Sequence, residues 1–438
     1  MNLAETLYRS YPPAFSHVRH IEAALSGGLD SVVLLHLLAR LQGRLNIKLT
    51  AVHVHHGLQQ QADGWLDFCQ NICQNLSVPL RWQKAEVRAQ GLGIEAAARR
   101  ERYRIFAQTP ADVVAAAHHA DDQVETFMLA ALRGGSLRAL AAMPEYRPLA
   151  DGKILWRPLL PFSRAQLAAY AAEHRLPHIE DPSNQSGDYL RNWLRHEGLP
   201  HWRRRRPDLD LHILTGVSLL QDELAVLDEV AAADLAAVQA DGLFDSGIWR
   251  QLSPARRRQA LLQFAQQQHL GVPSRASIRD FQRILDGLGG GTAQWRLPQG
   301  RIEAYNGKLF ALPDNAALPL PAFGTTVCPN DLAASEGWRL EAAGFGLPET
   351  VLREPALIRP VGRDDILHLG AGGKKKAAKL LQEYRIPPFL RPVWPVLADS
   401  GGRCLALAGL RTDARVSVKN GRLPVYRPLL DLIGRPPA

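Results

Sequence analysis

The sequence is poor in cysteine, and its four cysteines form no C-x-x-C pair. Cys69 and Cys73 fall on the apolar face of an expected helix, so we interpret them as small buried hydrophobic residues rather than as a disulfide or a metal site. Long apolar runs are also missing: no segment approaches the ~20 residues that span a bilayer. Met1 to Phe15 has no basic flank followed by a long apolar core. We therefore expect a cytoplasmic protein with no membrane partner.

Lysine is absent between Ile21 and Leu45, where the turn Ser26-Gly27-Gly28-Leu29-Asp30-Ser31 joins two apolar runs. A P-loop needs the pattern G-x-x-x-x-G-K-[ST], so this is a different loop. A strand that turns through glycines into a helix points backbone N–H groups and the positive end of the helix dipole at one spot, which favours phosphate. Asp30 would repel a phosphate unless a hard divalent cation lay between them, so we predict that it binds Mg²⁺.

This S-G-G-x-D-S turn resembles the loop of enzymes that split ATP into AMP and pyrophosphate. The resemblance implies that ATP is bound by Ser26, Gly27, Gly28, Leu29, Asp30 and Ser31. The simpler alternative is a Gly-Gly turn capped by serine or aspartate, with no ligand.

The chain of 438 residues is too long for one ordinary core, which indicates two or three domains. Residues 1–206 contain 25 Lys and Arg against 19 Asp and Glu, residues 207–352 contain 11 against 17, and residues 353–438 contain 16 against 7. The two basic ends favour a polyanionic partner, most simply a nucleic acid. The alternative is a generally basic, arginine-rich proteome.

Strand and helix signals alternate in the first third of the chain. Apolar strands are expected at 21–25, 49–54, 80–87 and 113–117, with helices near 63–76 and 95–108. This pattern predicts an α/β domain whose parallel sheet is covered on both faces and binds ligands at the carboxyl ends of its strands. Three strands end in polar clusters: Ser26 to Ser31, His53 to Gly57, and His118 to Asp122.

The third cluster, His118-His119-Ala120-Asp121-Asp122, precedes an amphipathic helix. Asp122 as N-cap and Glu125 three residues later would form a capping box. Capping explains neither histidine, and so polar a strand exit beside a phosphate loop favours a functional site. A further alternative makes these residues ligands of a transition metal together with His53 and His55, although their spacing matches no established metal motif.

A series of blocks in this order resembles the tRNA(Ile)-lysidine synthase family. The blocks are Ser26 to Ser31, His53 to Leu58, Ala98-Arg99 with Arg102-Tyr103, Ala117 to Thr126, Arg133-Gly134-Gly135, Arg157 to Leu160, and Asp181-Pro182-Ser183-Asn184 with Arg191-Asn192. The likeness resumes from Arg359 to Pro395, and the middle is weakly matched. It implies a Rossmann-like sheet domain of the adenine nucleotide alpha-hydrolase-like type.

The resemblance implies a ligase that modifies the wobble cytidine of an isoleucine tRNA with a CAU anticodon. In that family the cytosine O2 is adenylated by ATP with loss of pyrophosphate. The ε-amine of free L-lysine then attacks C2, releases AMP and leaves lysidine.

The same resemblance implies roles for individual residues. Asp30, with Mg²⁺, and His118 would be catalytic, and Asp122 and Glu125 would bind the ammonium groups of lysine. Arg99 and Arg102, on one helical face, are candidates for the cytidine and its 5′ phosphate. Because the attacking amine must lose a proton, some group has to accept it, and we suggest His118.

Further basic residues are candidates for tRNA binding, with a solvated surface as the alternative. They are Arg191, Arg195 and Arg203 to Arg206, and in the tail Lys374, Lys375, Lys376 and Lys379 at an expected helix start, with Arg359, Arg363 and Arg391 nearby in sequence.

We predict a PP-loop ATP-binding catalytic domain over 1–206 and a mainly helical tRNA-binding domain over 207–315. The latter would contain a long helix over 209–238, a helix opening at Ser253-Pro254, and a hairpin about Asn306-Gly307. A linker region over 316–352 and a small basic α+β tRNA-binding domain over 353–438 would follow, the latter with a second hairpin at Asn420-Gly421.

Two other functions stay open from the sequence. One is another enzyme of the same loop class, such as a tRNA thiolase or an amidotransferase-linked synthetase, although thiolases of this class resemble one another in paired C-x-x-C cysteines. The other is a nucleotide-gated RNA-binding protein without chemistry, which would not need acids beside a polyanion. The oligomeric state is also open, with a homodimer as one option.

Overall fold

The computed structural model describes residues 2–55, 62–85, 94–149, 152–180, 190–239 and 242–434. The predicted motif residues His56-Gly57-Leu58 and Asp181-Pro182-Ser183-Asn184 lie outside the described residues. The chain divides into two compact units, Met1–Val226 and Leu227–Ala438.

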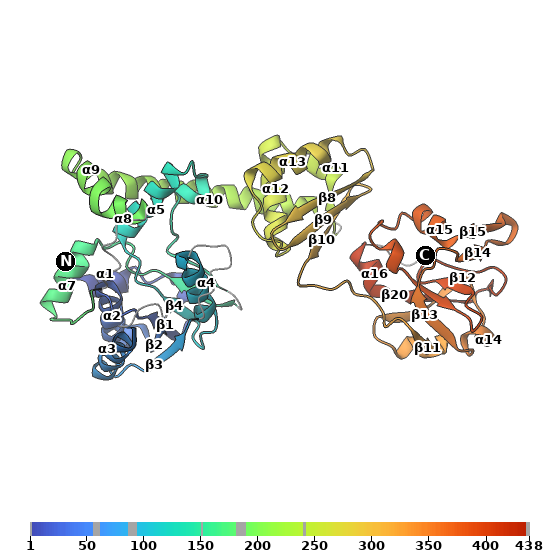
Figure 1. Cartoon of the computed structure of the whole chain (residues 1–438), viewed down its shortest axis with the longest axis horizontal. Coiled ribbons are helices and arrows are strands. Elements are labelled where there is room, and N and C mark those ends of the chain that lie inside the picture. The colour runs from blue at the N-terminus through green and yellow to red at the C-terminus, as the bar shows by residue number, and fades with distance from the viewer. Residues whose placement is uncertain are drawn as a thin grey trace. The chain divides into compact units, whose positions relative to one another are not determined.

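The first unit is built on a six-stranded sheet in the order β3-β2-β1-β4-β6-β5 (Figure 1). Its strands are β1 (His20–Ala24), β2 (Lys48–His55), β3 (Leu80–Lys84), β4 (Val113–Ala115), β5 (Tyr146–Pro148) and β6 (Ile154–Trp156). β5 is antiparallel to β6, and the other described pairings are parallel. The predicted α/β class with a parallel sheet is confirmed.

Helices cover both faces of this sheet: α1 (Leu3–Arg9), α2 (Leu29–Leu45), α3 (Ala62–Asn75) and α7 (Arg164–Glu173) contribute to one core, and α4 (Ile94–Ala107) contributes to the other. The unit also contains α5 (Ala120–Leu132), α6 (Leu137–Leu140), α8 (Leu190–Trp193) and α9 (Leu199–Arg205), of which α5 and α9 belong to a separate core. Successive residues of β4 point to opposite faces: Val113 and Ala115 join the core that contains α2, and Val114 joins the core that contains Phe106 of α4. Burial on both faces explains why the strands are apolar runs without polar alternation.

The chain reverses its direction of strand addition between β1 and β4, which lie side by side in parallel register with Ile21 opposite Val113. From β1 the sheet continues to β2 and β3 on one side, and from β4 to β6 and β5 on the other. Open α/β sheets bind ligands at this switch point, outside the carboxyl ends of the strands. The turn Ser26–Ser31 follows β1 there, and His118 to Asp122 follows β4.

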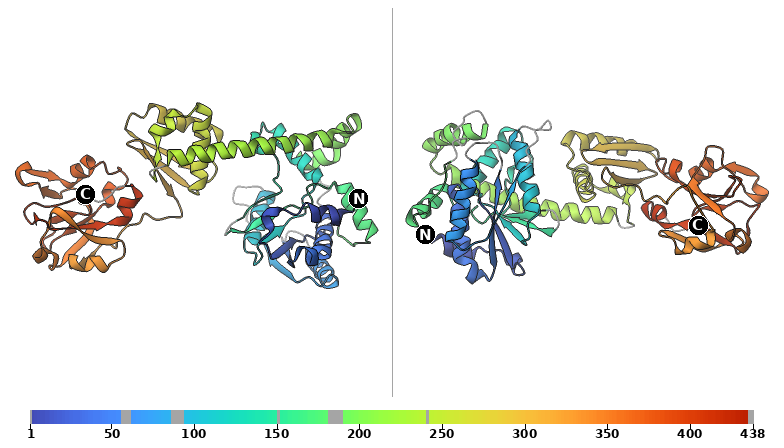
Figure 2. Two further views of the ribbon diagram at one scale, coloured as in Figure 1. Left: turned by 180° about the vertical axis from the view of Figure 1, so that it is seen from behind. Right: turned by 60° about the horizontal axis from the view of Figure 1, so that its bottom comes forward.

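Helix α10 (Leu209–Val238) confirms the predicted long helix, and the boundary between the two units falls within it (Figure 2). The second unit continues with α11 (Ser246–Gln251), α12 (Pro254–Gln267) and α13 (Arg275–Gly287) beside a sheet ordered β7-β10-β9-β8. Its strands are β7 (Phe244–Asp245), β8 (Thr292–Leu297), β9 (Gly300–Tyr305) and β10 (Lys308–Pro313). The hairpin about Asn306-Gly307 is confirmed, with φ angles of 48° and 78° that suit its two-residue turn.

The rest of the second unit is a mixed α+β fold, as predicted. Its strands are β11 (Thr325–Val327), β12 (Trp338–Leu347), β13 (Ala356–Pro360), β14 (Ile366–His368), β15 (Lys374–Lys376), β16 (Pro395–Ala398), β17 (Cys404–Leu407), β18 (Arg411–Thr412), β19 (Val418–Lys419) and β20 (Arg422–Tyr426). Its helices are α14 (Glu349–Leu352), α15 (Ala377–Glu383) and α16 (Arg427–Leu432). The strands form sheets ordered β11-β13-β16-β17-β18, β19-β12-β20 and β14-β15.

Two predictions for this region are wrong. The expected linker over 316–352 contains β11, which pairs with β13, and β12, which pairs with β20. Trp338 of β12 is 2% exposed in the same core as Ile358, so this segment belongs to the fold. Lys374–Lys376 does not begin a helix: it forms β15 against β14, and α15 begins at Ala377.

The second predicted hairpin, at Asn420-Gly421, is also wrong, because β19 and β20 pair with β12 and not with each other. The chain crosses β12 where the backbones of Gly346 and Gly421 nearly touch. A Cβ on Gly346 would lie 2.5 Å from the Arg422 nitrogen, whereas one on Gly344 would meet no atom within 4 Å.

We therefore expect Gly346→Ala to destabilise the second unit by about 1–3 kcal/mol, because the added methyl group must push two backbones apart. Gly344→Ala, on the same strand, is the matched control and should leave stability nearly unchanged. Thermal unfolding followed by circular dichroism compares the two variants. Equal midpoints would contradict the close crossing.

Candidate functional site

Hydrogen bonds of its two serines, Ser26 and Ser31, fix the conformation of the loop between β1 and α2. The Ser31 hydroxyl donates to the Gly28 carbonyl at 2.8 Å and accepts from the Ser26 N–H at 3.2 Å, and the two hydroxyl oxygens lie 3.1 Å apart. Gly27 has φ +90°, and a Cβ there would lie 3.0 Å from Ile179 Cδ1. Only glycine fits this position, and Gly28 then caps the N-terminus of α2. The geometry suits a phosphate ligand, with the helix dipole behind the loop.

Asp30, in the first turn of α2, has a buried Oδ1 atom with no hydrogen-bond partner among the residues that the structure describes. An orphaned carboxylate oxygen beside a phosphate-binding loop fits a divalent cation, which would gain its other ligands from phosphates and water. No three His, Cys, Asp or Glu side chains come together as metal ligands within the described residues. The Nδ1–H of His53 donates to the Leu25 carbonyl at 2.9 Å, so that atom is engaged behind the loop.

His119 joins the loop to α5. Its Nε2 lies 3.6 Å from Asp30 Oδ2 and 3.6 Å from Asp122 Oδ2, and its Nδ1 lies 3.7 Å from Asp121 Oδ2. Burial alone would lower the pKa of His119, but the carboxylates of Asp30, Asp122 and Asp121 raise it above its ordinary value. The His119 ring therefore lies between Asp30 of the loop after β1 and the acidic side chains at the start of α5.

The predicted capping box is shifted by three residues. His119, not Asp122, is the N-cap of α5, and Asp122 is the third helical residue, whose Oδ2 accepts the His119 N–H at 3.1 Å. Strand β4 ends at Ala115 and α5 begins at Ala120, so the residue that precedes the helix is His119. Asp122 does serve the cap, but Glu125 does not.

Glu125 and Asp122 instead form an ionic quartet with Arg191 and Arg195. Arg191 Nε lies 2.9 Å from Glu125 Oε2, and its Nη2 lies 3.1 Å from Asp122 Oδ1. Arg195 Nη2 lies 2.8 Å from Glu125 Oε2 and 3.3 Å from Asp122 Oδ1. Glu125 is 2% exposed, so its charge depends on these partners. The structure thus unites the predicted lysine-binding acids with two predicted tRNA-binding arginines.

His118 lies beside the quartet with a buried Nδ1 atom that has no hydrogen-bond partner in the described part of the chain. Burial lowers its pKa to about 4, against the opposing effect of Asp122, and Arg157, Arg99 and Arg191 lower it further. His118 is therefore neutral at physiological pH, and a pKa this low makes it a weak proton acceptor in this state.

A group of cations surrounds Tyr103 on α4. The guanidinium carbons of Arg99 and Arg147 lie 5.1 Å and 4.9 Å from the ring centre, and Arg99 donates to the Tyr103 hydroxyl at 3.2 Å. Arg157 is 3% exposed, and its Nε atom has no hydrogen-bond partner within the described ranges. Arg102, predicted with Arg99, lies exposed on the same helix. This arrangement suits an anion, and Arg147 has no counterpart among the predicted site residues.

The sequence prediction also did not assign roles to His119 or Arg157. Both lie inside the motifs that indicated the family, so the motif blocks were the available signal. Arg147 had no such signal, because it comes from β5 at the sheet edge.

The predicted tRNA-binding lysines of the tail differ in their pairing. Lys375 Nζ lies 2.9 Å from Glu383, and Lys376 Nζ lies 3.6 Å from Asp364. Lys374 is exposed and has no acidic partner among the described residues. Arg359 is bound by Asp365 at 2.7 Å, and Arg391 donates to the Ile386 carbonyl, so these two support the fold.

Burial raises the pKa of Cys69 to about 12, of Cys73 to about 11 and of Cys404 to about 12. These thiols are therefore poor sources of thiolate, which disfavours sulfur-transfer chemistry at them. None of the helices that the structure describes is long and apolar enough to cross a membrane.

Three family models match successive parts of the chain: a PP-loop domain over residues 2–202, a TilS substrate binding domain over 246–310, and a TilS substrate C-terminal domain over 358–426. The first of these covers the loop, His118, His119 and the ionic quartet.

Curated relatives match almost from end to end. The tRNA(Ile)-lysidine synthase of Neisseria gonorrhoeae is 46% identical over 92% of this chain and 91% of its own length. Those of Chromobacterium violaceum and Pseudomonas aeruginosa are 38% and 37% identical, covering 97% and 85% of this chain and 99% and 86% of their own. On this evidence the chain belongs to the tRNA(Ile)-lysidine synthase family.

Proposed function

We propose that this protein uses ATP to ligate free L-lysine to C2 of the wobble cytidine of an isoleucine tRNA with a CAU anticodon, giving lysidine, AMP and pyrophosphate. The observation that carries the proposal is the meeting of Asp30 and Asp122 on one nitrogen of His119, each at 3.6 Å. A loop suited to phosphates and an acidic pair suited to an amine thereby border one another.

The proposal assigns ATP to the Ser26–Ser31 loop. The loop N–H groups and the two serine hydroxyls would hold phosphate oxygens, and Asp30 would bind Mg²⁺ through its buried Oδ1. Bound Mg²⁺ would offset phosphate charge there. We assign the ATP chemistry to residues 1–206 and tRNA binding to residues 207–315 and 353–438.

The cations around Tyr103 would position the cytidine. Arg99, Arg147 and Arg157 converge on this ring, and each lowers its pKa, so a nucleotide phosphate would offset their mutual repulsion. The same phosphate would weaken the effect of Arg99 and Arg157 on His118 and raise its pKa. His118 would then become a stronger acceptor for the lysine proton once RNA is bound.

Asp122 and Glu125 would bind the ammonium groups of lysine. Because Arg191 and Arg195 already pair with both acids, a lysine ammonium would have to replace a guanidinium. RNA phosphates would provide alternative partners for the released arginines, which reconciles the two predicted roles of this quartet.

The direct test is incubation with labelled lysine, ATP, Mg²⁺ and a tRNA transcript that has a CAU anticodon. We expect label in the RNA, with AMP and pyrophosphate as products, and no label in the same transcript with uridine at the wobble position. Release of ADP, or label in protein and not in RNA, would contradict the proposal.

The binding of lysine by Asp122 and Glu125 can be tested separately from their structural role in the ionic quartet. Glu125→Gln removes the charge that a lysine ammonium needs, so we expect the KM for lysine to rise roughly 10- to 100-fold and that for ATP to change little. Arg195→Gln is the matched variant, because it breaks ion pairs of the same quartet and keeps both carboxylates. It should not raise the KM for lysine. Equal effects of the two variants would show that the acids only hold the arginines.

The basic tail can be tested by the salt dependence of tRNA binding. Removing one cation that binds an RNA phosphate should make the slope of log K against log salt shallower by about 0.7 to 0.9. We expect this change for Lys374→Ala, whose ammonium has no acidic partner among the described residues. Arg353→Ala removes a charge already paired with Glu349 and should leave the slope unchanged. The same slope in both variants would argue against binding of RNA at Lys374.

A further inference from the structure

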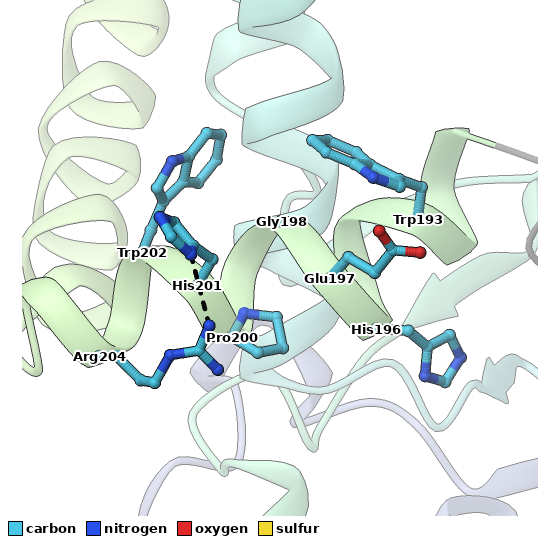
Figure 3. Close-up of a pocket in the computed structure, with 8 residues that line it drawn as sticks. All are labelled: Trp193, His196, Glu197, Gly198, Pro200, His201, Trp202 and Arg204. Atoms are coloured by element: carbon cyan, nitrogen blue, oxygen red, sulfur yellow. Dashed lines mark hydrogen bonds between the residues drawn. The ribbon is translucent and has the colours of Figure 1, made fainter.

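A pocket of about 450 Å³ lies on the helical segment that runs from α8 to α9. It is lined by side chains that combine aromatic surface with hydrogen-bonding groups, among them Trp193, Glu197, His201, Trp202 and Arg204. Figure 3 shows the Trp193 and Trp202 rings on the same side of the segment, with Gly198 between them. Its volume falls within the range of about 300–1,000 Å³ typical of small-ligand sites.

The local backbone is built to leave this space. Residues Leu194–Gly198 form a π-helical turn between α8 and α9, a rare form that often marks functional sites. Gly198 is buried beneath Trp193: a Cβ there would lie 3.1 Å from Trp193 Cζ3 and 3.3 Å from Leu194 Cδ2. Glycine therefore allows the Trp193 indole to lie close over the helix.

The two indoles have different surroundings. Trp202 packs against the core that joins α5, α9 and α10, which includes Val124 and Leu199. Trp193 is 39% exposed and belongs to no described hydrophobic core. One ring is thus fixed by the fold, and the other presents a face to solvent.

The rim of the pocket suits a nucleotide. Arg204 contacts the His201 Nδ1 at 3.3 Å, and neither it nor the neighbouring Arg205 has an acidic partner among the described residues. Glu197, which lines the same pocket, has no cationic partner in the described part of the chain. An aromatic face, a cation and a hydrogen-bond acceptor match the base, phosphate and amino group of an unpaired nucleotide.

The pocket also lies close to the ionic quartet. Arg191 and Arg195 are four residues apart and face α5, and Trp193 between them lies on the opposite side of the same helical turn. Trp202, which also lines the pocket, packs in the same core as Val124, the residue before Glu125.

We infer that this pocket binds an unpaired base of the tRNA anticodon loop that flanks the modified cytidine. The base stacks on Trp193 over Gly198, Glu197 accepts a hydrogen bond from its amino group, and Arg204 contacts its phosphate. This inference rests on the proposed function, because it takes the RNA to be a tRNA whose anticodon loop enters the site.

The test uses the full-length protein and an anticodon stem-loop RNA with the CAU anticodon. Trp193→Ala should weaken RNA binding about 5- to 100-fold, and Trp193→Phe should restore part of the affinity, because a smaller aromatic face remains. Trp82→Ala is the matched control: Trp82 is 50% exposed on β3 and should not affect binding. The KM values for ATP and lysine should stay near those of the wild type.

A second RNA series locates the base. An abasic nucleotide at the stacked position should weaken binding to the wild type as much as Trp193→Ala does, with no further weakening when the two changes are combined. Additive effects at every loop position, or wild-type affinity in Trp193→Ala, would overturn the inference. A rise in the KM for ATP or lysine with unchanged RNA affinity would also overturn it, because the pocket would then serve a small substrate.

Failure of the inference and of the proposed function can be distinguished. If the wild type ligates lysine and Trp193→Ala binds RNA normally, only the pocket assignment fails. If the wild type ligates no lysine, the proposed function fails whatever the stem-loop binding shows. Circular dichroism of Trp193→Ala and Trp193→Phe checks that weaker binding does not come from misfolding.

Discussion

The buried carboxylate of Glu125 is the constraint on which this part of the molecule depends. A charged carboxylate removed from water is costly unless cations and hydrogen bonds replace its hydration. Arg191 and Arg195 supply them, although they follow Glu125 by 66 and 70 residues in the chain. The requirement fixes the α8 segment against α5 and so determines where the π-helical turn and the Trp193 pocket lie. If Asp122 and Glu125 bind the lysine ammonium, as we propose, that ammonium must replace one of these guanidinium groups during the reaction.

A second constraint comes from the order of the sheet. Because β1 and β4 are parallel neighbours, with Ala23 opposite Ala115, the segments that follow them emerge side by side. His119 can therefore lie between Asp30 and Asp122, whose helices start at the same edge. The loop is also held from outside: the Ile179 N–H donates to the Gly27 carbonyl at 2.9 Å, beneath the position that a Gly27 side chain would occupy. Backbone geometry thus brings the charges together before any substrate binds.

Sequence reasoning succeeded where the determining interactions are local. The Asn306-Gly307 turn was predictable because its two φ angles depend on those residues alone. The same dipeptide type at Asn420-Gly421 failed because β12, from about 80 residues earlier, lies between the two strands. The alternation of apolar strands and helices indicated the α/β class. The polar strand exits predicted the candidate site, and the structure brings two of them together, at Asp30 and at His119. Neither could reveal the ionic quartet, since nothing in the local pattern pairs Glu125 with Arg191.

Net charge illustrates the same limit and has a consequence for function. The tail has an excess of nine positive charges, yet Arg359, Lys375 and Lys376 already have acidic partners, so a count overstates the charge available to RNA.

In the first unit the pairing of Arg191 and Arg195 with carboxylates has a consequence for substrate binding. Guanidinium groups bind phosphates and carboxylates through the same bidentate geometry, so Arg191 and Arg195 can change partners and keep their hydrogen bonds. An RNA phosphate that attracted them would leave Asp122 and Glu125 without cations in a buried setting, and a lysine ammonium would restore the balance. On this argument RNA binding favours lysine binding, and by linkage lysine must favour RNA binding to the same extent.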